Sequence, residues 1–151
     1  MRTVVLTSAL SAAAAAVGSL GTTPESEWYR SLDKPPWQPP PVAFPLVWTP
    51  LYGLIAYGTG RLVDSDPGAR GPLLALTTAD LVVNASWNWA FFDRQSPRAG
   101  MAVIGVLNVL NVSLFGAAVR RDRRAAAALA PYVAWTGFAT VLNGAIWRRN
   151  R

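Results

Sequence analysis

The positions of the charged residues constrain this chain more than any other feature of its sequence. Of 14 basic and 8 acidic residues, all but Asp80 lie in six short clusters. A membrane-spanning helix needs about 20 mostly apolar residues. A helix on the surface of a soluble protein instead carries charges on its wet face every turn or two. The five long intervals between the clusters therefore predict an all-α membrane protein, a bundle of five transmembrane helices.

The expected helices belong to one domain, which covers residues 1–151. Their approximate limits are 3–23, 43–62, 72–92, 99–119 and 125–147. The first stretch also has the features of a cleaved signal peptide, because a basic start and an apolar middle precede small residues. On the residues alone both interpretations of this stretch stay open.

Composition excludes several functions. The chain has no cysteine and no histidine, which rules out disulfides, thiol catalysis and imidazole ligands for a metal, so we expect no metal site. The net charge of +6 comes from basic residues near helix ends, where Lys and Arg meet lipid headgroups. We therefore expect membrane lipid, and no nucleic acid, as a partner. Lys and Arg divide evenly between the two sides, so the orientation in the membrane is not predicted.

Three of the expected helices carry aromatic and hydrogen-bonding side chains at helical spacing on one face. The pairs are Trp48 with Tyr52, Asn84 with Trp87, and Trp135 with Asn143. If these faces converge, they line an aromatic cavity for a large, flat, apolar ligand. The alternative is that the tryptophans form interfacial belts and the asparagines join helices. We favour that alternative for Trp28, Trp89 and Trp147, which lie close to charge clusters.

Other polar residues also lie within the apolar intervals. Asn108 and Asn111 are one turn apart, and we expect them to make hydrogen bonds between helices. A carboxylate such as Asp80 costs about 2.5–3.5 kcal/mol in a membrane helix on insertion scales. Either it lies near enough to a helix end to be partly wet, or it has a functional role.

The segment WYRSLDKPPWQPPP at 28–41 holds five prolines and can be neither helix nor strand for long. As an isolated motif it would suit a polyproline ligand of another protein. Its position between two predicted spans indicates a stiff interfacial loop over 24–42 instead. Proline lacks an N–H, so such a loop leaves fewer amides unsatisfied at the membrane boundary.

Three segments resemble the TspO/MBR family of translocator and tryptophan-rich sensory proteins. They are WYRSLDKPPWQPPPVAFPLVWTPLY at 28–52, LVVNASWNWAFF at 81–92 and APYVAWTGFATVLNGAIWRRN at 130–150. The resemblance implies a multi-pass bundle of five helices, typically a homodimer, in a bacterial-type cell membrane. It also implies binding of tetrapyrroles such as protoporphyrin IX, and in some members of sterols and synthetic aromatic compounds.

The resemblance adds two loop residues, Tyr29 and Trp37, to the predicted site, and it suggests that loop 24–42 closes over the ligand as a lid. With neighbours on the same helix faces, the expected ligand-binding residues are Tyr29, Trp37, Phe44, Trp48, Tyr52, Asn84, Trp87, Phe91, Trp135, Leu142 and Asn143. No cofactor is required, and porphyrin is the expected ligand. A site without histidine has no imidazole for iron, which favours metal-free porphyrin over haem.

Two further functions follow from the same resemblance. Light-dependent porphyrin degradation would give Trp48 and Trp135 a photochemical role, but the sequence has no acid–base or nucleophile constellation, so we do not expect an enzyme. Transport of porphyrin or sterol would need paired broken helices, whereas only the second span has a clear mid-helix proline, Pro50.

The sequence departs from the family pattern at two places. Gly144 and Ala145 stand where a sterol-linked motif requires a tyrosine, which argues against cholesterol binding. Thr77 and Asp80 stand where the family commonly has tyrosine and glutamine. An ionised Asp80 close to the ligand would disfavour the propionates of a porphyrin.

Overall fold

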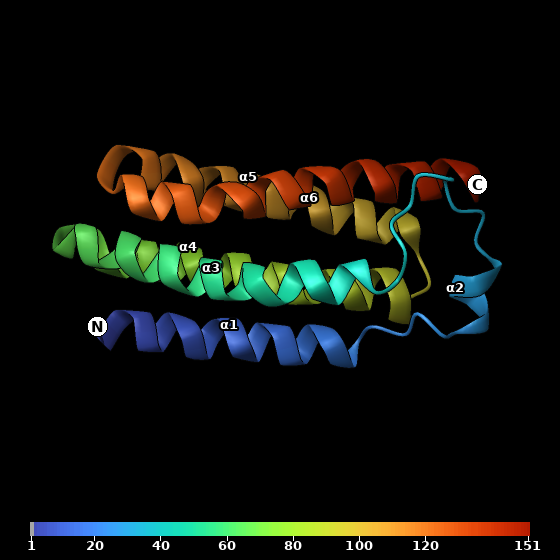
Figure 1. Cartoon of the computed structure of the whole chain (residues 1–151), viewed down its shortest axis with the longest axis horizontal. Helices are drawn as coiled ribbons and strands as arrows, with labels where there is room; N and C mark the ends of the chain where they lie inside the picture. The colour runs from blue at the N-terminus through green and yellow to red at the C-terminus, as the bar shows by residue number, and fades with distance from the viewer. Residues whose placement is uncertain (1) are drawn as a thin grey trace.

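The computed structural model describes residues 2–151, and within this range it is 84% helical and contains no strand. The helices are α1 (Arg2–Leu20), α2 (Glu27–Ser31), α3 (Ala43–Ser65), the 3-10 turn η1 (Pro67–Ala69), α4 (Arg70–Asn88), the π-helical turn η2 (Trp89–Asp93), α5 (Pro97–Arg121) and α6 (Arg123–Arg149). The long helices lie lengthwise beside one another, and the two ends of the chain lie at opposite ends of the molecule (Figure 1).

Short polar side chains fix where the last two helices begin. Ser96 accepts a hydrogen bond from the amide of Ala99 at 3.1 Å, and Pro97 occupies the first turn of α5, where its missing N–H is not needed. Asp122 accepts hydrogen bonds from the amides of Arg124 and Ala125. A single aspartate thus caps the start of α6 immediately after the end of α5.

The long helices form a closed ring. α1 packs against α3 and α4, α3 packs against α6, α6 packs against α5, and α5 packs against α4. The order around the ring therefore differs from the order along the chain. Each long helix turns one face towards the interior of the ring, where the aromatic and polar faces predicted from the sequence meet.

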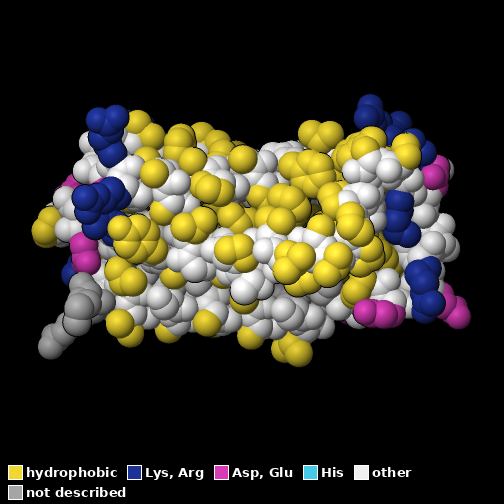
Figure 2. All heavy atoms as spheres, in the orientation of Figure 1, with side chains coloured by type: hydrophobic (Ala, Val, Ile, Leu, Met, Phe, Trp, Pro, Cys, Tyr) yellow, Lys and Arg dark blue, Asp and Glu magenta, His cyan; other side chains and the backbone are white. Residues whose placement is uncertain are grey.

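Within residues 2–151, three helices are long and apolar enough to cross a membrane: α1 over Thr3–Leu20, α5 over Pro97–Arg121 and α6 over Arg123–Arg149. Figure 2 shows basic and acidic side chains gathered at the two ends of the molecule and a band of apolar and uncharged side chains between them. For α3 and α4, which the sequence also assigns to the membrane, spanning stays a prediction.

Helix α1 is packed into the ring by specific contacts. The Thr7 hydroxyl donates to the carbonyl oxygen of Ala56 in α3 at 2.7 Å, and just after the end of α1 the Thr22 hydroxyl donates to Oδ1 of Asn88 at 3.0 Å. Gly60 lets the backbones of α1 and α3 approach closely, because a Cβ there would lie 2.9 Å from the Cα of Val4. These contacts favour a helix that is part of the fold over a cleaved signal peptide.

Two predictions about buried polar residues can be judged directly. Asn108 donates to Thr140 at 2.8 Å and Asn111 donates to Thr136 at 3.1 Å, which confirms the expected hydrogen bonds between α5 and α6. Asp80 lies near the middle of α4 and is 0% exposed. The interpretation that Asp80 is partly wet near a helix end is therefore wrong.

We predict that Gly60→Ala destabilises the protein by about 1–3 kcal/mol, because the added methyl group overpacks the contact with α1. Its Cβ would lie 2.8 Å from Cγ2 of Val4 and 2.9 Å from the Thr7 hydroxyl oxygen. Gly53→Ala, in the same helix, is the matched control because nothing lies within 4 Å of its Cβ position. Unfolding in detergent would measure both variants, and equal stability would contradict the close contact.

Candidate functional site

A cavity of about 590 Å³ lies inside the ring, at the end covered by the loop between α1 and α3. Ligand sites of proteins typically measure about 300–1,000 Å³. Its walls come from α1, α3, α4, η2, α5 and α6 together with that loop. The aromatic side chains that line it are Tyr29, Phe44, Trp48, Tyr52, Trp87, Phe91, Phe92 and Trp135.

The aromatic rings of the cavity pack on one another. The rings of Trp87 and Phe91 are stacked, with centroids 5.1 Å apart and planes inclined by 21°. Trp48 and Tyr52, one turn apart in α3, lie 5.4 Å apart. Trp135 contacts Phe44 edge to face at 6.1 Å. Such contacts restrict the rings and leave the cavity with fixed aromatic walls.

Asn143 joins three helices at one side of the cavity. Its Oδ1 accepts from the indole N–H of Trp87 at 3.1 Å, and its Nδ2 donates to the carbonyl oxygen of Pro97 at 2.7 Å. A glycine at position 100 leaves room for this arrangement, since a Cβ there would lie 2.6 Å from the Asn143 Oδ1. The amide thus fixes the orientation of the Trp87 ring.

A chain of hydrogen bonds leads from the cavity into the protein. The Tyr52 hydroxyl donates to Asn84 Oδ1 at 2.9 Å, and Asn84 Nδ2 donates to the Tyr132 hydroxyl oxygen at 2.7 Å. The Tyr132 hydroxyl in turn donates to Asp80 Oδ2 at 3.0 Å. Tyr52 and Asn84 line the cavity, whereas Tyr132 and Asp80 lie behind them.

The π-helical turn η2 shapes another part of the wall. Its wider hydrogen bonds run from the amide of Arg94 to the carbonyl of Trp89 and from the amide of Ser96 to the carbonyl of Phe91. Consecutive side chains of a regular helix point about 100° apart. In η2 both Phe91 and Phe92 are buried, with ring centroids 5.0 Å apart, and both line the cavity.

The loop over the cavity is held by contacts at Asp33 and at Tyr29. Asn150 accepts a hydrogen bond from the Asp33 amide and donates one to its carbonyl, each at 2.9 Å. Tyr29 receives a hydrogen bond from Gln38 at 3.2 Å and lies under the ammonium group of Lys34, 4.5 Å from its ring centroid. Burial raises the pKa of the Tyr29 hydroxyl, and the hydrogen bond from Gln38 opposes this shift.

Ten of the eleven residues predicted for the site line the cavity. The exception is Trp37, which is 48% exposed and packs edge to face on Phe138 of α6, with centroids 6.1 Å apart. The turn in which the Gln38 amide bonds to the carbonyl of Pro35 directs the Trp37 ring along the outside of α6. In this structure Tyr29, and not Trp37, is the loop ring that reaches the cavity.

Sequence reasoning missed the contributions of two helices to the wall. α1 supplies Ala15, Gly18 and Ser19, and α5 supplies Ile104 and Leu107. Small and aliphatic residues occur throughout apolar helices, so no signal in one sequence distinguishes those that face a cavity.

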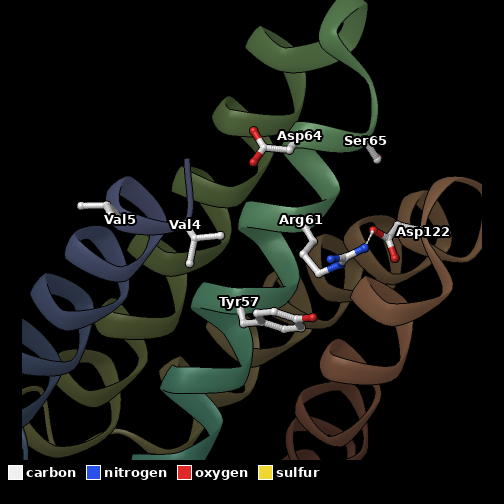
Figure 3. A pocket seen from close by; sticks show the side chains of 7 residues that line it. All are labelled: Val4, Val5, Tyr57, Arg61, Asp64, Ser65 and Asp122. Carbon is white, nitrogen blue, oxygen red and sulfur yellow. Dashed lines mark ion pairs between the residues drawn. The ribbon is translucent and has the colours of Figure 1, made fainter. Parts of the chain in front are cut away.

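A second hollow, of about 520 Å³, lies at the opposite end of the ring (Figure 3). Its lining residues are Val4, Val5, Tyr57, Arg61, Asp64, Ser65 and Asp122. An ion pair of 2.6 Å joins Arg61 to Asp122 beside it, and its single aromatic ring belongs to Tyr57. Between residues 2 and 151 no group of three or more acidic side chains is arranged to hold a metal ion.

We predict that Trp87 and Asn143 are energetically coupled. A double-mutant cycle of Trp87→Phe and Asn143→Leu, measured by unfolding in detergent, should give a coupling energy of about 1 kcal/mol for the lost hydrogen bond. The control cycle pairs Trp87→Phe with Asn108→Leu, because Asn108 bonds to Thr140 and shares no partner with Trp87. Additivity in both cycles would contradict the role assigned to Asn143.

Comparison with known proteins places the chain in a family. Residues 5–148 match the TspO/MBR family. The tryptophan-rich protein TspO of Chlorobaculum tepidum is 33% identical over 141 residues, 89% of each chain. The tryptophan-rich sensory protein of Cereibacter sphaeroides is 34% identical over 90% of this chain and 87% of its own. The translocator protein of Homo sapiens is 35% identical over 82% of this chain and 75% of its own. The chain belongs to the TspO/MBR family.

Proposed function

We propose that this protein is an integral membrane receptor for a tetrapyrrole of the protoporphyrin IX type, with a sensory or homeostatic role. The observation that carries the proposal is the cavity of about 590 Å³, whose walls combine aromatic rings from three sides with a few polar groups. A large flat ring system matches such walls, because aromatic faces stack on one another and exclude water.

Trp48, Trp87 and Trp135 are the three tryptophans that line the cavity, and they come from three different helices. The indole N–H of Trp135 is buried and has no hydrogen-bond partner in the described chain. A ligand with an acceptor group would satisfy this donor, which is otherwise costly to bury. Because the sequence has no histidine, no imidazole is present to bind iron, and metal-free porphyrin is the better fit.

The proposal includes five membrane spans, with α3 and α4 crossing beside α1, α5 and α6. The polar residues that lower the hydropathy of α4 are buried: Thr77 and Asp80 are 0% exposed and Asn84 is 3% exposed. Side chains that face other helices do not contact lipid, so they do not prevent a helix from spanning. An odd number of crossings also agrees with chain ends at opposite ends of the molecule (Figure 1).

The loop completes the proposed site. Tyr29 would close over one edge of the ligand, and Lys34, whose ammonium group lies over the Tyr29 ring, would be close enough to meet a propionate at the mouth. A relative from Cereibacter sphaeroides is named a sensory protein. The corresponding role here would be to report porphyrin in the membrane, while pairing into a homodimer stays a prediction.

We predict that Trp48→Ala with Trp135→Ala weakens protoporphyrin IX binding at least about tenfold, since two aromatic walls are lost. The porphyrin absorbance band, titrated with protein in detergent, gives the dissociation constant without relying on tryptophan emission. Trp147→Ala is the matched control, because Trp147 packs on Arg151 and does not line the cavity. If the double variant binds as tightly as the wild type, the cavity is not the porphyrin site.

We also predict that Tyr29→Ala speeds dissociation of protoporphyrin IX more than Trp37→Ala does. Tyr29 lines the cavity, whereas Trp37 packs on the outside of α6. The measurement is stopped-flow dissociation into an excess of a porphyrin-binding acceptor, with an expected increase of about three- to tenfold for Tyr29→Ala. Unchanged rates in both variants would show that the loop is not a lid.

A further inference from the structure

The hydrogen-bond chain behind the cavity ends on a carboxylate. Asp80 is 0% exposed, and in residues 2–151 its Oδ1 has no hydrogen-bond partner, while its Oδ2 accepts from Tyr132. The Tyr132 hydroxyl donates to this oxygen, and an ionised carboxylate can only accept hydrogen bonds. The hydrogen of the Tyr132 hydroxyl is therefore committed to Asp80, and the oxygen of that hydroxyl is left to accept.

The direction of this hydrogen bond fixes the directions of the next two hydrogen bonds, those at Asn84 and Tyr52. The Tyr132 oxygen accepts from Asn84 Nδ2, which fixes the orientation of the Asn84 amide. Asn84 Oδ1 then faces Tyr52 and accepts the hydrogen of its hydroxyl. If the amide were turned round, Asn84 Oδ1 would face the Tyr132 oxygen, and two acceptors would meet with no hydrogen between them. Each donor thus points towards Asp80.

The cavity end of the chain is consequently an acceptor. Tyr52 lines the cavity, and its hydroxyl hydrogen is already used by Asn84. No described residue donates to the Tyr52 oxygen, whose lone pairs stay available. Asn84 is 3% exposed, so the Tyr52 oxygen is the more accessible end of the chain.

We propose that Asp80 is a positioning residue that makes the Tyr52 side of the cavity selective for an N–H donor at the edge of a flat aromatic ligand. It touches no ligand itself; it acts through Tyr132, Asn84 and Tyr52. The inference rests on the proposed function only in taking the cavity as the ligand site, and it holds for any flat ring that reaches Tyr52.

Carbazole and dibenzofuran test the inference, because they share three fused rings but carry an edge N–H donor and an edge oxygen acceptor, respectively. Wild-type protein should bind carbazole about three- to tenfold more tightly than dibenzofuran, the effect of one net hydrogen bond. Calorimetric titration in detergent gives both constants. Protein with Trp48→Ala and Trp135→Ala corrects for partition of the compounds into micelles.

Variants at Asp80 and Tyr52, the two ends of the hydrogen-bond chain, test whether the direction of its hydrogen bonds sets the ligand preference. In Asp80→Leu the Tyr132 hydroxyl loses its acceptor. The chain then reverses, so that the unpaired hydrogen lies at Tyr52 in the cavity instead of in the interior. The carbazole preference should fall to about one or invert. Asp80→Asn keeps an oxygen that can accept from Tyr132, and it should retain the preference.

Tyr52→Phe removes the acceptor without changing Asp80 and should also abolish the preference, which keeps the test available if Asp80→Leu does not fold. Equal affinities in the wild type, or an unchanged ratio in Asp80→Leu and Tyr52→Phe, would overturn the inference. Titration of the same preparations with protoporphyrin IX judges the proposed function separately. A carbazole preference without porphyrin binding would refute the proposal that the protein binds protoporphyrin IX, and it would leave the role of Asp80 intact.

Discussion

Hydrogen bonds between polar side chains inside the ring of helices are the interactions on which the rest of this structure depends. The hydrocarbon core of a membrane holds no water that could form hydrogen bonds with these groups, so their hydrogen bonds are made within the protein. Asn143 joins α6 to α4 and α5, Asn111 joins α5 to α6, and Asn84 joins α4 to α3 and α6. These bonds set which helix faces turn inwards, and the aromatic cavity is built on the faces that they select.

Much of the fold could be predicted from where charges are absent. Long uncharged intervals predict long helices, and short polar residues such as Ser96 and Asp122 mark where two of them begin. The order of helices around the ring could not be predicted, because it depends on close contacts such as Gly60 against Val4 that leave no periodic signal. The burial of Thr77, Asp80 and Asn84 in α4 could not be predicted either, because it depends on the neighbouring helices that cover these residues.

The part of the candidate site that is built from aromatic and amide side chains could be predicted from the sequence. Aromatic and asparagine side chains at helical spacing, with their neighbours on the same faces, indicate nine of the cavity's lining residues, and the family resemblance adds Tyr29. The resemblance places Trp37 at the cavity, whereas in the structure the turn around Pro35 brings its ring against Phe138 of α6. The partner of Asp80 was also beyond prediction, since Tyr132 is 52 residues away and is brought to it only by the packing of α6.

The order of helices around the ring has a consequence for biosynthesis. The contact between α3 and α6 closes the ring, and it joins segments that leave the ribosome far apart in time. Until α6 is in place, Tyr132, Trp135 and Asn143 are missing, and two donors of α4, Asn84 Nδ2 and the indole N–H of Trp87, lack their partners. Incompletely inserted chains would therefore have neither a cavity nor a satisfied interior. Quality control in the membrane would have exposed asparagine and aspartate side chains to recognise.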